Sequence, residues 1–141
     1  MDVDITRRRT FFDRIRIAFN VDAVALSYLV RESTILTHQV LTHSLQDLET
    51  ISVPKDPLVV VIPVITRSEV ISCPSISRTN GRMDCPIMRA EGLEAILAIP
   101  VKDKQFGSAA LSVLNAEPRI WNKAEAEQLK NYAKKMELDR F

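Results

Sequence analysis

The residue types best suited to bind a ligand gather in the centre of the chain, between Thr66 and Glu91. This stretch combines arginines with hydroxyl side chains and holds both cysteines of the chain. Guanidinium groups and hydroxyl donors suit a small anion, such as a carboxylate or a phosphate. A connection of this length in a compact domain is commonly a binding loop. The candidate ligand-binding residues are Arg67, Ser75, Ser77, Arg78, Asn80, Arg82, Asp84 and Cys85. For each of them, the alternative interpretation is a solvent-exposed loop residue without a role in binding.

Two cysteines, Cys73 and Cys85, are the only candidate nucleophiles. Thiol catalysis requires an exposed thiolate of low pKa and a resolving partner. Arg82 and Arg89 could lower the pKa of a nearby thiol, and a helix beginning beside Cys85 would act in the same direction. The alternative is a pair of ordinary buried cysteines, which fits a reducing compartment better than a disulfide.

The two histidines, His38 and His43, do not form a metal or catalytic site. Their odd separation on an extended strand points them to opposite faces, and no cysteine or carboxylate stands at ligand spacing beside them. We therefore expect single surface or edge histidines and predict no metal site. The sequence does not indicate a Ser-His-Asp catalytic triad either.

Composition excludes several classes of protein. The chain has three glycines, Gly81, Gly92 and Gly107, whereas phosphate-binding loops and dinucleotide fingerprints need clustered ones, so we predict no such cofactor. Its 19 basic and 18 acidic residues give a net charge of +1, which disfavours nucleic-acid binding by bulk charge.

The length of 141 residues fits one domain, residues 1–141. No apolar run reaches the roughly 18–20 residues that span a bilayer, and the first ten residues lack the apolar stretch of a secretory signal. We expect a cytoplasmic protein that does not enter membranes.

Helices are predicted at both ends of the chain. Near the N-terminus, apolar residues recur at helical spacing from about Ile5 to Asn20, and the cluster 7–9 of arginines is interpreted as a solvated helix face rather than a nucleic-acid site. A charged amphipathic helix closes the chain from about Asn122, its expected N-cap, to Asp139.

Between these helices, alternation and turn residues predict strands and one short helix. The expected elements are a hairpin of strands 23–30 and 34–42, a loop or short helical turn over 45–57, a buried strand over 58–65, a helix over 85–91 with Asp84 as N-cap, and strands 95–101 and 105–114.

Three phrases near the C-terminus stand in register. GLEAILAIPV, from Gly92 to Val101, and FGSAALSV, from Phe106 to Val113, are followed by Asn115, Trp121 and Glu125. Together they resemble the GAF domain family of small sensory modules. The match covers about fifty residues in these phrases, and the order of elements extends it over most of the chain.

This resemblance implies an α+β fold of α/β/α layers, profilin-like, with a central antiparallel sheet of five to six strands flanked by helices. It implies terminal helices on one face, which often build a homodimer, and ligand loops on the other. Two departures matter. Ala116 and Ala126 replace residues typical of cyclic-nucleotide-binding members, and Pro86 after Cys85 replaces the histidine of bilin-binding members.

The leading hypothesis is a sensory or regulatory domain that binds a small molecule, with an anion as the candidate class, between the sheet and the loops over 66–91. The alternative is a ligand-free dimerisation or protein-interaction domain. A third hypothesis is a thiol-dependent methionine sulfoxide reductase. Because no output domain is visible, we expect a separate output protein as partner, or a chain cut from a longer one.

Overall fold

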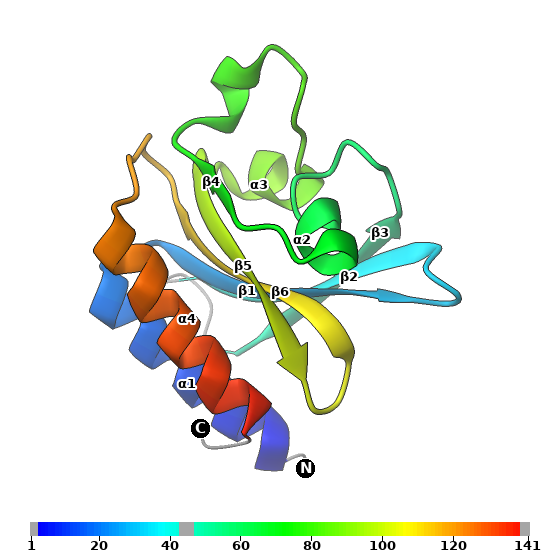
Figure 1. Ribbon diagram of the computed structural model, residues 1–141, viewed down its shortest axis with the longest axis vertical. Helices are drawn as coiled ribbons and strands as arrows, with labels where there is room; N and C mark the ends of the chain where they lie inside the picture. The colour runs from blue at the N-terminus through cyan, green and yellow to red at the C-terminus, as the bar shows by residue number, and fades with distance from the viewer. Residues whose placement is uncertain (1–2, 43–46, 139–141) are drawn as a thin grey trace.

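An antiparallel sheet of six strands forms the centre of the protein in the computed structural model, which describes residues 3–42 and 47–138 (Figure 1). The strand order is β3-β2-β1-β6-β5-β4. This arrangement confirms the predicted α+β fold. The strands are β1 (Ala23–Val30), β2 (Ile35–Thr42), β3 (Glu49–Pro54), β4 (Ile71–Cys73), β5 (Ala95–Asp103) and β6 (Gly107–Asn115).

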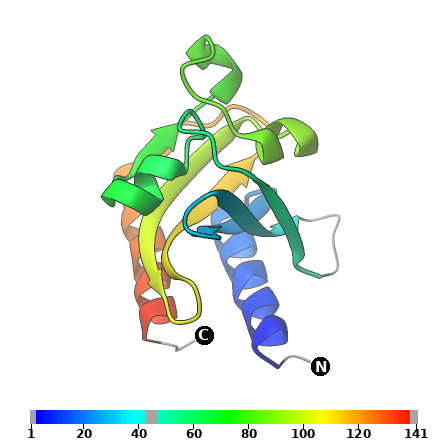
Figure 2. The ribbon, with the colours of Figure 1, turned by 90° about the vertical axis from the view of Figure 1, so that its right-hand side faces the viewer.

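Helices cover both faces of this sheet. The long terminal helices α1 (Val3–Phe19) and α4 (Lys123–Glu137) lie side by side on one face (Figures 1 and 2). The other face carries three short elements, α2 (Ile62–Arg67), the 3-10 helix η1 (Ile76–Thr79) and α3 (Pro86–Glu91). No helix of the described residues is long and apolar enough to cross a membrane.

Strand β1 shows how alternation assigns side chains to the two layers. Val24 and Leu26 are buried against the terminal helices, whereas Ala23 and Ala25 are buried in the layer of α2 and α3. Successive residues of a strand point to opposite faces, so the predicted pattern is confirmed.

Aromatic and capping contacts fix the terminal helices. The Tyr132 ring of α4 lies 5.7 Å from the Phe11 ring and 6.2 Å from the Phe19 ring of α1, measured between centroids. Asn122 is the N-cap of α4, as predicted, and it forms a reciprocal capping box with Glu125.

Two element predictions are wrong. Residues 58–65 do not form a strand, because Pro63 lies in the first turn of α2, where the missing N–H of proline costs nothing. Strand β3 lies instead inside the segment 45–57 that was predicted as a loop, and it pairs with β2 along the sheet edge.

Arg8 does not lie on a solvated face, contrary to prediction. Its side chain is buried, and Nη2 forms an ion pair with Asp103 Oδ1 at 3.0 Å. Its guanidinium also lies 5.7 Å from the Phe106 ring, which stacks on Tyr28 with centroids 3.9 Å apart. A partner 95 residues away in sequence makes this burial possible.

His38 is also buried rather than at the surface, with an exposed fraction of 1%. Strand β3 pairs with β2, so His38 does not lie on an edge strand, and its Nδ1 atom lies 2.7 Å from Ser27 Oγ on β1. Burial lowers the pKa of His38 to about 4. His43 lies outside the described residues.

Candidate functional site

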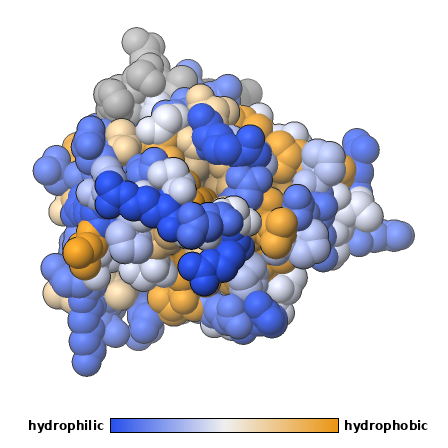
Figure 3. Space-filling model, turned by 90° about the horizontal axis from the view of Figure 1, so that it is seen from above, coloured by the Kyte–Doolittle hydropathy of each residue, from blue (hydrophilic) through white to orange (hydrophobic). Residues whose placement is uncertain are grey.

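A groove of about 540 Å³ lies between the segment that follows β4 and the connection from β6 to α4. Figure 3 shows the molecule from the side where these loops lie, with strongly hydrophilic side chains beside hydrophobic ones. We call this cavity the arginine groove, after Arg78, Arg82 and Arg119. The residues that line it are Cys73, Pro74, Ser75, Arg78, Thr79, Arg82, Pro118, Arg119 and Ile120.

Backbone hydrogen bonds hold the two walls of the arginine groove together. The Arg119 N–H donates to the Pro74 carbonyl oxygen at 3.1 Å, so the β6–α4 connection runs beside the end of β4. On the other wall, the Ile76 N–H donates to the Glu94 carbonyl oxygen at 2.8 Å and anchors η1 to the start of β5.

Two guanidinium groups of the groove lack a carboxylate partner. The side chain of Arg78 is exposed and makes no hydrogen bond or ion pair with any described residue, although the Arg78 backbone N–H donates to the Ser75 carbonyl oxygen at 3.2 Å. Arg82 donates from Nε to the Thr79 carbonyl oxygen at 3.2 Å, but it has no ion pair within the described part of the chain. These positive charges are therefore available to an anion.

Glu94 accepts hydrogen bonds from two residues that the sequence analysis assigned to a ligand. Its Oε1 atom accepts from Ser75 Oγ at 2.8 Å and from the Ser77 N–H at 2.7 Å. These hydrogen bonds, led by the backbone N–H of Ser77, lower the pKa of Glu94. The carboxylate of Glu94 thus takes the place of an anionic ligand at these donors.

A second hollow of about 370 Å³ lies on the other side of η1, against α3. It includes Ser77 and Asp84 of the predicted residues. Arg89 donates to both carboxylate oxygens of Asp84, at 2.8 and 3.0 Å, and its hydrogen bond lowers the pKa of Asp84. Because this pair is already neutralised, the hollow is less suited to an anion than the arginine groove.

Three predicted site residues line neither cavity. Arg67 is the last residue of α2, and its Nε lies 3.4 Å from Glu69 Oε1. Asn80 follows η1 in a left-handed conformation with φ of 55°. Cys85 is buried and is itself the N-cap of α3, so the predicted cap, Asp84, is wrong by one position. Asp84 instead accepts the Cys85 N–H through Oδ1 at 2.8 Å.

Burial dominates the chemistry of Cys85. It raises the pKa of the thiol to about 11, and the opposing backbone hydrogen bonds from Met88 and Ile87 do not compensate. The expected activation by a helix start and by arginines is therefore outweighed by desolvation. Cys73 is buried as well.

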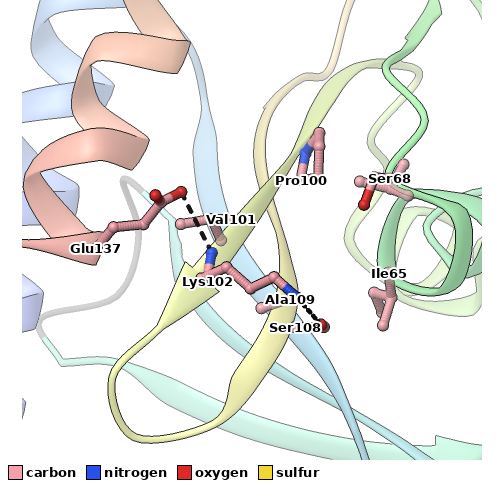
Figure 4. Close-up of a pocket in the computed structure, with 9 residues that line it drawn as sticks. Ile65, Ser68, Pro100, Val101, Lys102, Ser108, Ala109 and Glu137 are labelled. Atoms are coloured by element: carbon pink, nitrogen blue, oxygen red, sulfur yellow. Dashed lines mark hydrogen bonds between the residues drawn. The ribbon is translucent and has the colours of Figure 1, made fainter.

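A third cavity of about 210 Å³ separates α2 from the β5–β6 hairpin, with Glu137 of α4 at its rim (Figure 4). Its polar groups serve one another: Lys102 Nζ donates to Ser108 Oγ at 2.8 Å, and the Lys102 N–H donates to Glu137 Oε2 at 3.4 Å. This cavity offers a ligand fewer free polar partners than the arginine groove does.

Comparison with known proteins found no matching family model and no curated protein. Solved structures do match. The GAF domain of Acinetobacter phosphoenolpyruvate-protein phosphotransferase aligns with a TM-score of 0.72 at 16% identity, covering 92% of this chain and 76% of that one. The chain has the GAF fold.

Two other solved structures align over nearly their whole length. The red/green cyanobacteriochrome NpR6012g4 gives a TM-score of 0.71 at 15% identity, covering 99% of this chain and 94% of that one. Staphylococcus aureus NreA, mutated in its nitrate binding site, aligns with a TM-score of 0.64 at 14% identity, covering 94% of this chain and 99% of that one.

In this example of the GAF fold, apolar side chains fill the layer between the sheet and α2 and α3. They pack on a floor of small residues, Ala25, Ala98 and Ala110 among them; the covering residues include Val60, Val61, Val64, Ile87 and Met88, all buried. Three buried polar side-chain atoms of the sheet, His38 Nε2, Gln39 Oε1 and Ser112 Oγ, have no hydrogen-bond partner among the described residues. The arginine groove and the hollow beside α3 are lined mainly by the loops around η1 and α3.

The described residues contain no group of three histidine, cysteine or carboxylate side chains that could hold a metal ion.

Two residues important for the groove, Glu94 and Arg119, were not identified from the sequence. Both lie outside the central stretch. Glu94 contacts Ser77, 17 residues away, and Arg119 contacts Phe19, 100 residues away.

Proposed function

We propose that this chain is a single regulatory domain of the GAF fold, acting in the cytoplasm, that binds a small anionic molecule in the arginine groove. The observation that carries the proposal is the pairing of about 540 Å³ of cavity with two guanidinium groups that lack an ion-pair partner within the described residues. A guanidinium binds carboxylate or phosphate through two parallel hydrogen bonds, which gives both orientation and affinity.

The walls of the groove favour a ligand with an apolar body as well as an anionic group. Pro74, Pro118 and Ile120 line it beside the arginines, and the Ile120 side chain is exposed there. Apolar walls with a few polar groups are the usual composition of small-molecule sites. The near-zero net charge of the chain favours such local recognition over general polyanion binding.

Regulation by such a domain requires the ligand to prefer one arrangement of the terminal helices over another. We propose that α1 and α4 carry this difference, through a homodimer or to a separate output protein. We place no catalytic step in this function, because the buried thiol of Cys85 has a raised pKa of about 11.

The test is thermal denaturation with phenyl phosphate, benzoate and phenol, three probes that share a ring and differ in the anion. Stabilisation by the two anions but not by phenol is the expected result, since a ligand that binds only the folded state raises Tm. Loss of the effect in Arg78→Gln/Arg82→Gln, but not in Arg14→Gln/Arg31→Gln, would assign it to the groove. Both double variants remove two positive charges, and the control pair lies outside the groove.

The alternative is a ligand-free dimerisation or protein-interaction domain, favoured by the filled layer between the sheet and α2 and α3. Sedimentation equilibrium combined with the same denaturation series separates the two. A stable dimer that none of the anionic probes stabilises would support the alternative and contradict ligand binding in the groove.

A further inference from the structure

Arg119 connects three parts of the molecule that are far apart in sequence. Its Nη1 donates to the Asn20 carbonyl oxygen at 3.0 Å, and its Nη2 donates to the Phe19 carbonyl oxygen at 2.9 Å, both at the end of α1. The same Nη2 lies 2.6 Å from Glu125 Oε2 in the first turn of α4. One guanidinium thus joins the end of one terminal helix to the start of the other.

Glu125 is also part of the cap that starts α4. Its Oε1 accepts the Asn122 N–H at 3.0 Å, while Asn122 Oδ1 accepts the Glu125 N–H at 2.8 Å. The two oxygens of this carboxylate therefore divide their roles: one belongs to the capping box and the other to Arg119.

The same arginine lines the arginine groove, beside Arg78 and Arg82. Its Nε makes no hydrogen bond with any described residue, although the two Nη atoms are engaged. The guanidinium carbon lies 4.6 Å from the ring of Trp121, the only tryptophan of the chain. Tryptophan fluorescence can therefore report on this junction.

We propose that Arg119 is shared between the start of α4 and the arginine groove, so that an anion bound in the groove competes with Glu125 for its guanidinium. This inference rests on the proposed function, and it specifies how binding would reach the terminal helices. The side chains of Arg119 and Glu125 are 25% and 17% exposed, and a partly exposed pair is weak enough to exchange. An anion already held by Arg78 and Arg82 has the advantage of proximity.

Exchange at Arg119 would alter both terminal helices together. The contacts to the Phe19 and Asn20 carbonyl oxygens and to Glu125 depend on one side chain, so a shift of that side chain loosens the end of α1 and the start of α4 at once. Coupling between two sites is reciprocal. Weakening the Arg119–Glu125 pair must therefore strengthen binding in the groove.

The test compares Glu125→Gln with Glu127→Gln by calorimetric titration of phenyl phosphate at fixed ionic strength. Glutamine keeps an acceptor for the Asn122 N–H but removes the charge that holds Arg119. Glu127 is an exposed residue on the same helix, and among the described residues it pairs only with Lys130. Its Glu→Gln variant changes the net charge by the same amount without touching Arg119. We expect Glu125→Gln to bind roughly threefold to tenfold more tightly than the wild type and Glu127→Gln to match the wild type.

Trp121 fluorescence supplies the second measurement. Phenyl phosphate should change the emission of the wild type, and Arg119→Gln should lose that change while binding more weakly. Equal affinities of Glu125→Gln and Glu127→Gln, with the wild type still binding, would overturn the coupling and leave the proposed function in place. No binding of phenyl phosphate to any of these proteins would contradict the proposed function and the coupling with it.

Discussion

At the scale of single residues, His38 makes stability depend on pH. Its pKa is about 4 in the folded protein, against 6.5 for an ordinary histidine, because burial disfavours the charged ring. As the pH falls below about 6.5, the unfolded chain takes up a proton that the folded chain refuses. The contribution of His38 is therefore complete above that pH and is lost as the pH falls toward 4.

We predict that the free energy of unfolding, measured with urea, falls by about 2 kcal/mol between pH 7.5 and pH 5. The variant His38→Gln serves as control, since it has no proton to gain and should show a flatter profile over this range. Identical pH profiles for the two proteins would show that His38 is not the titrating group.

Cys85 and Cys73 should resist modification while the protein is folded. Both thiols are buried, and the pKa of Cys85 is raised to about 11, so little thiolate exists near neutral pH. With iodoacetamide at pH 8, mass spectrometry should find almost no label on the native protein and two labels after unfolding in guanidinium. Rapid labelling of Cys85 in the native protein would revive the thiol-reductase hypothesis.

The candidate site could be predicted from the sequence only in part, for a reason visible in Ser75 and Ser77. Their residue types were interpreted as donors to an anionic ligand, whereas the carboxylate that they contact in the structure is Glu94. Arg78 and Arg82 have no ion pair, because no described carboxylate lies within ion-pair distance of them. Whether a donor is free depends on neighbours in space, which residue type and spacing do not specify.

At the scale of elements, the capping box determines where α4 begins. We predict that Asn122→Ala lowers the free energy of unfolding by about 1 kcal/mol, because it removes the side-chain acceptor of the Glu125 N–H. Asn131→Ala makes the same chemical change at an exposed position inside the helix, where alanine is a better helix former, and it should not destabilise. Urea denaturation of both variants measures the difference, and equal losses would contradict the capping role.

Short apolar runs mark the limit of prediction at this scale. The segment over 58–65 is apolar almost throughout, so periodicity alone does not separate a buried strand from a buried helix. Its Pro63 fits the first turn of α2. Conversely, β3 has a readable alternation, with Ile51 and Val53 directed to the core, but the flanking hydroxyls and prolines suggested a loop.

At the scale of the whole molecule, the ion pair between Arg8 and Asp103 ties α1 to the β5–β6 hairpin. Asp103 also accepts the N–H groups of Gln105 and Phe106 at 3.0 Å, so it organises the turn while it holds the helix. Removing one member of the pair deprives a buried charge of this ion pair, which is costly, whereas removing both members is less so.

We predict that Asp103→Asn and Arg8→Met each lower the free energy of unfolding by about 3 kcal/mol, and that the double variant loses less than the sum. Asp13→Asn is the matched control, since it breaks the part-exposed Arg16–Asp13 pair on the same helix and should cost less than about 1 kcal/mol. A double-mutant cycle in urea measures the coupling. Strict additivity would mean that the two side chains contribute independently.

The resemblance to GAF domains implied the layers of this protein. The sequence by itself determined several of its helices and strands, because hydrophobic periodicity is a local property that assigns a regular element its buried face. The hairpin of β1 and β2, the strands β5 and β6, and the cap of α4 follow from it directly. Only the tertiary structure decided which polar groups are satisfied. Arg8 is buried because Asp103 meets it, His38 because β3 pairs with its strand, and Arg119 lies at the helix junction because α1 ends there. Such pairings depend on distance in space, and the chain sets that distance only when it is folded.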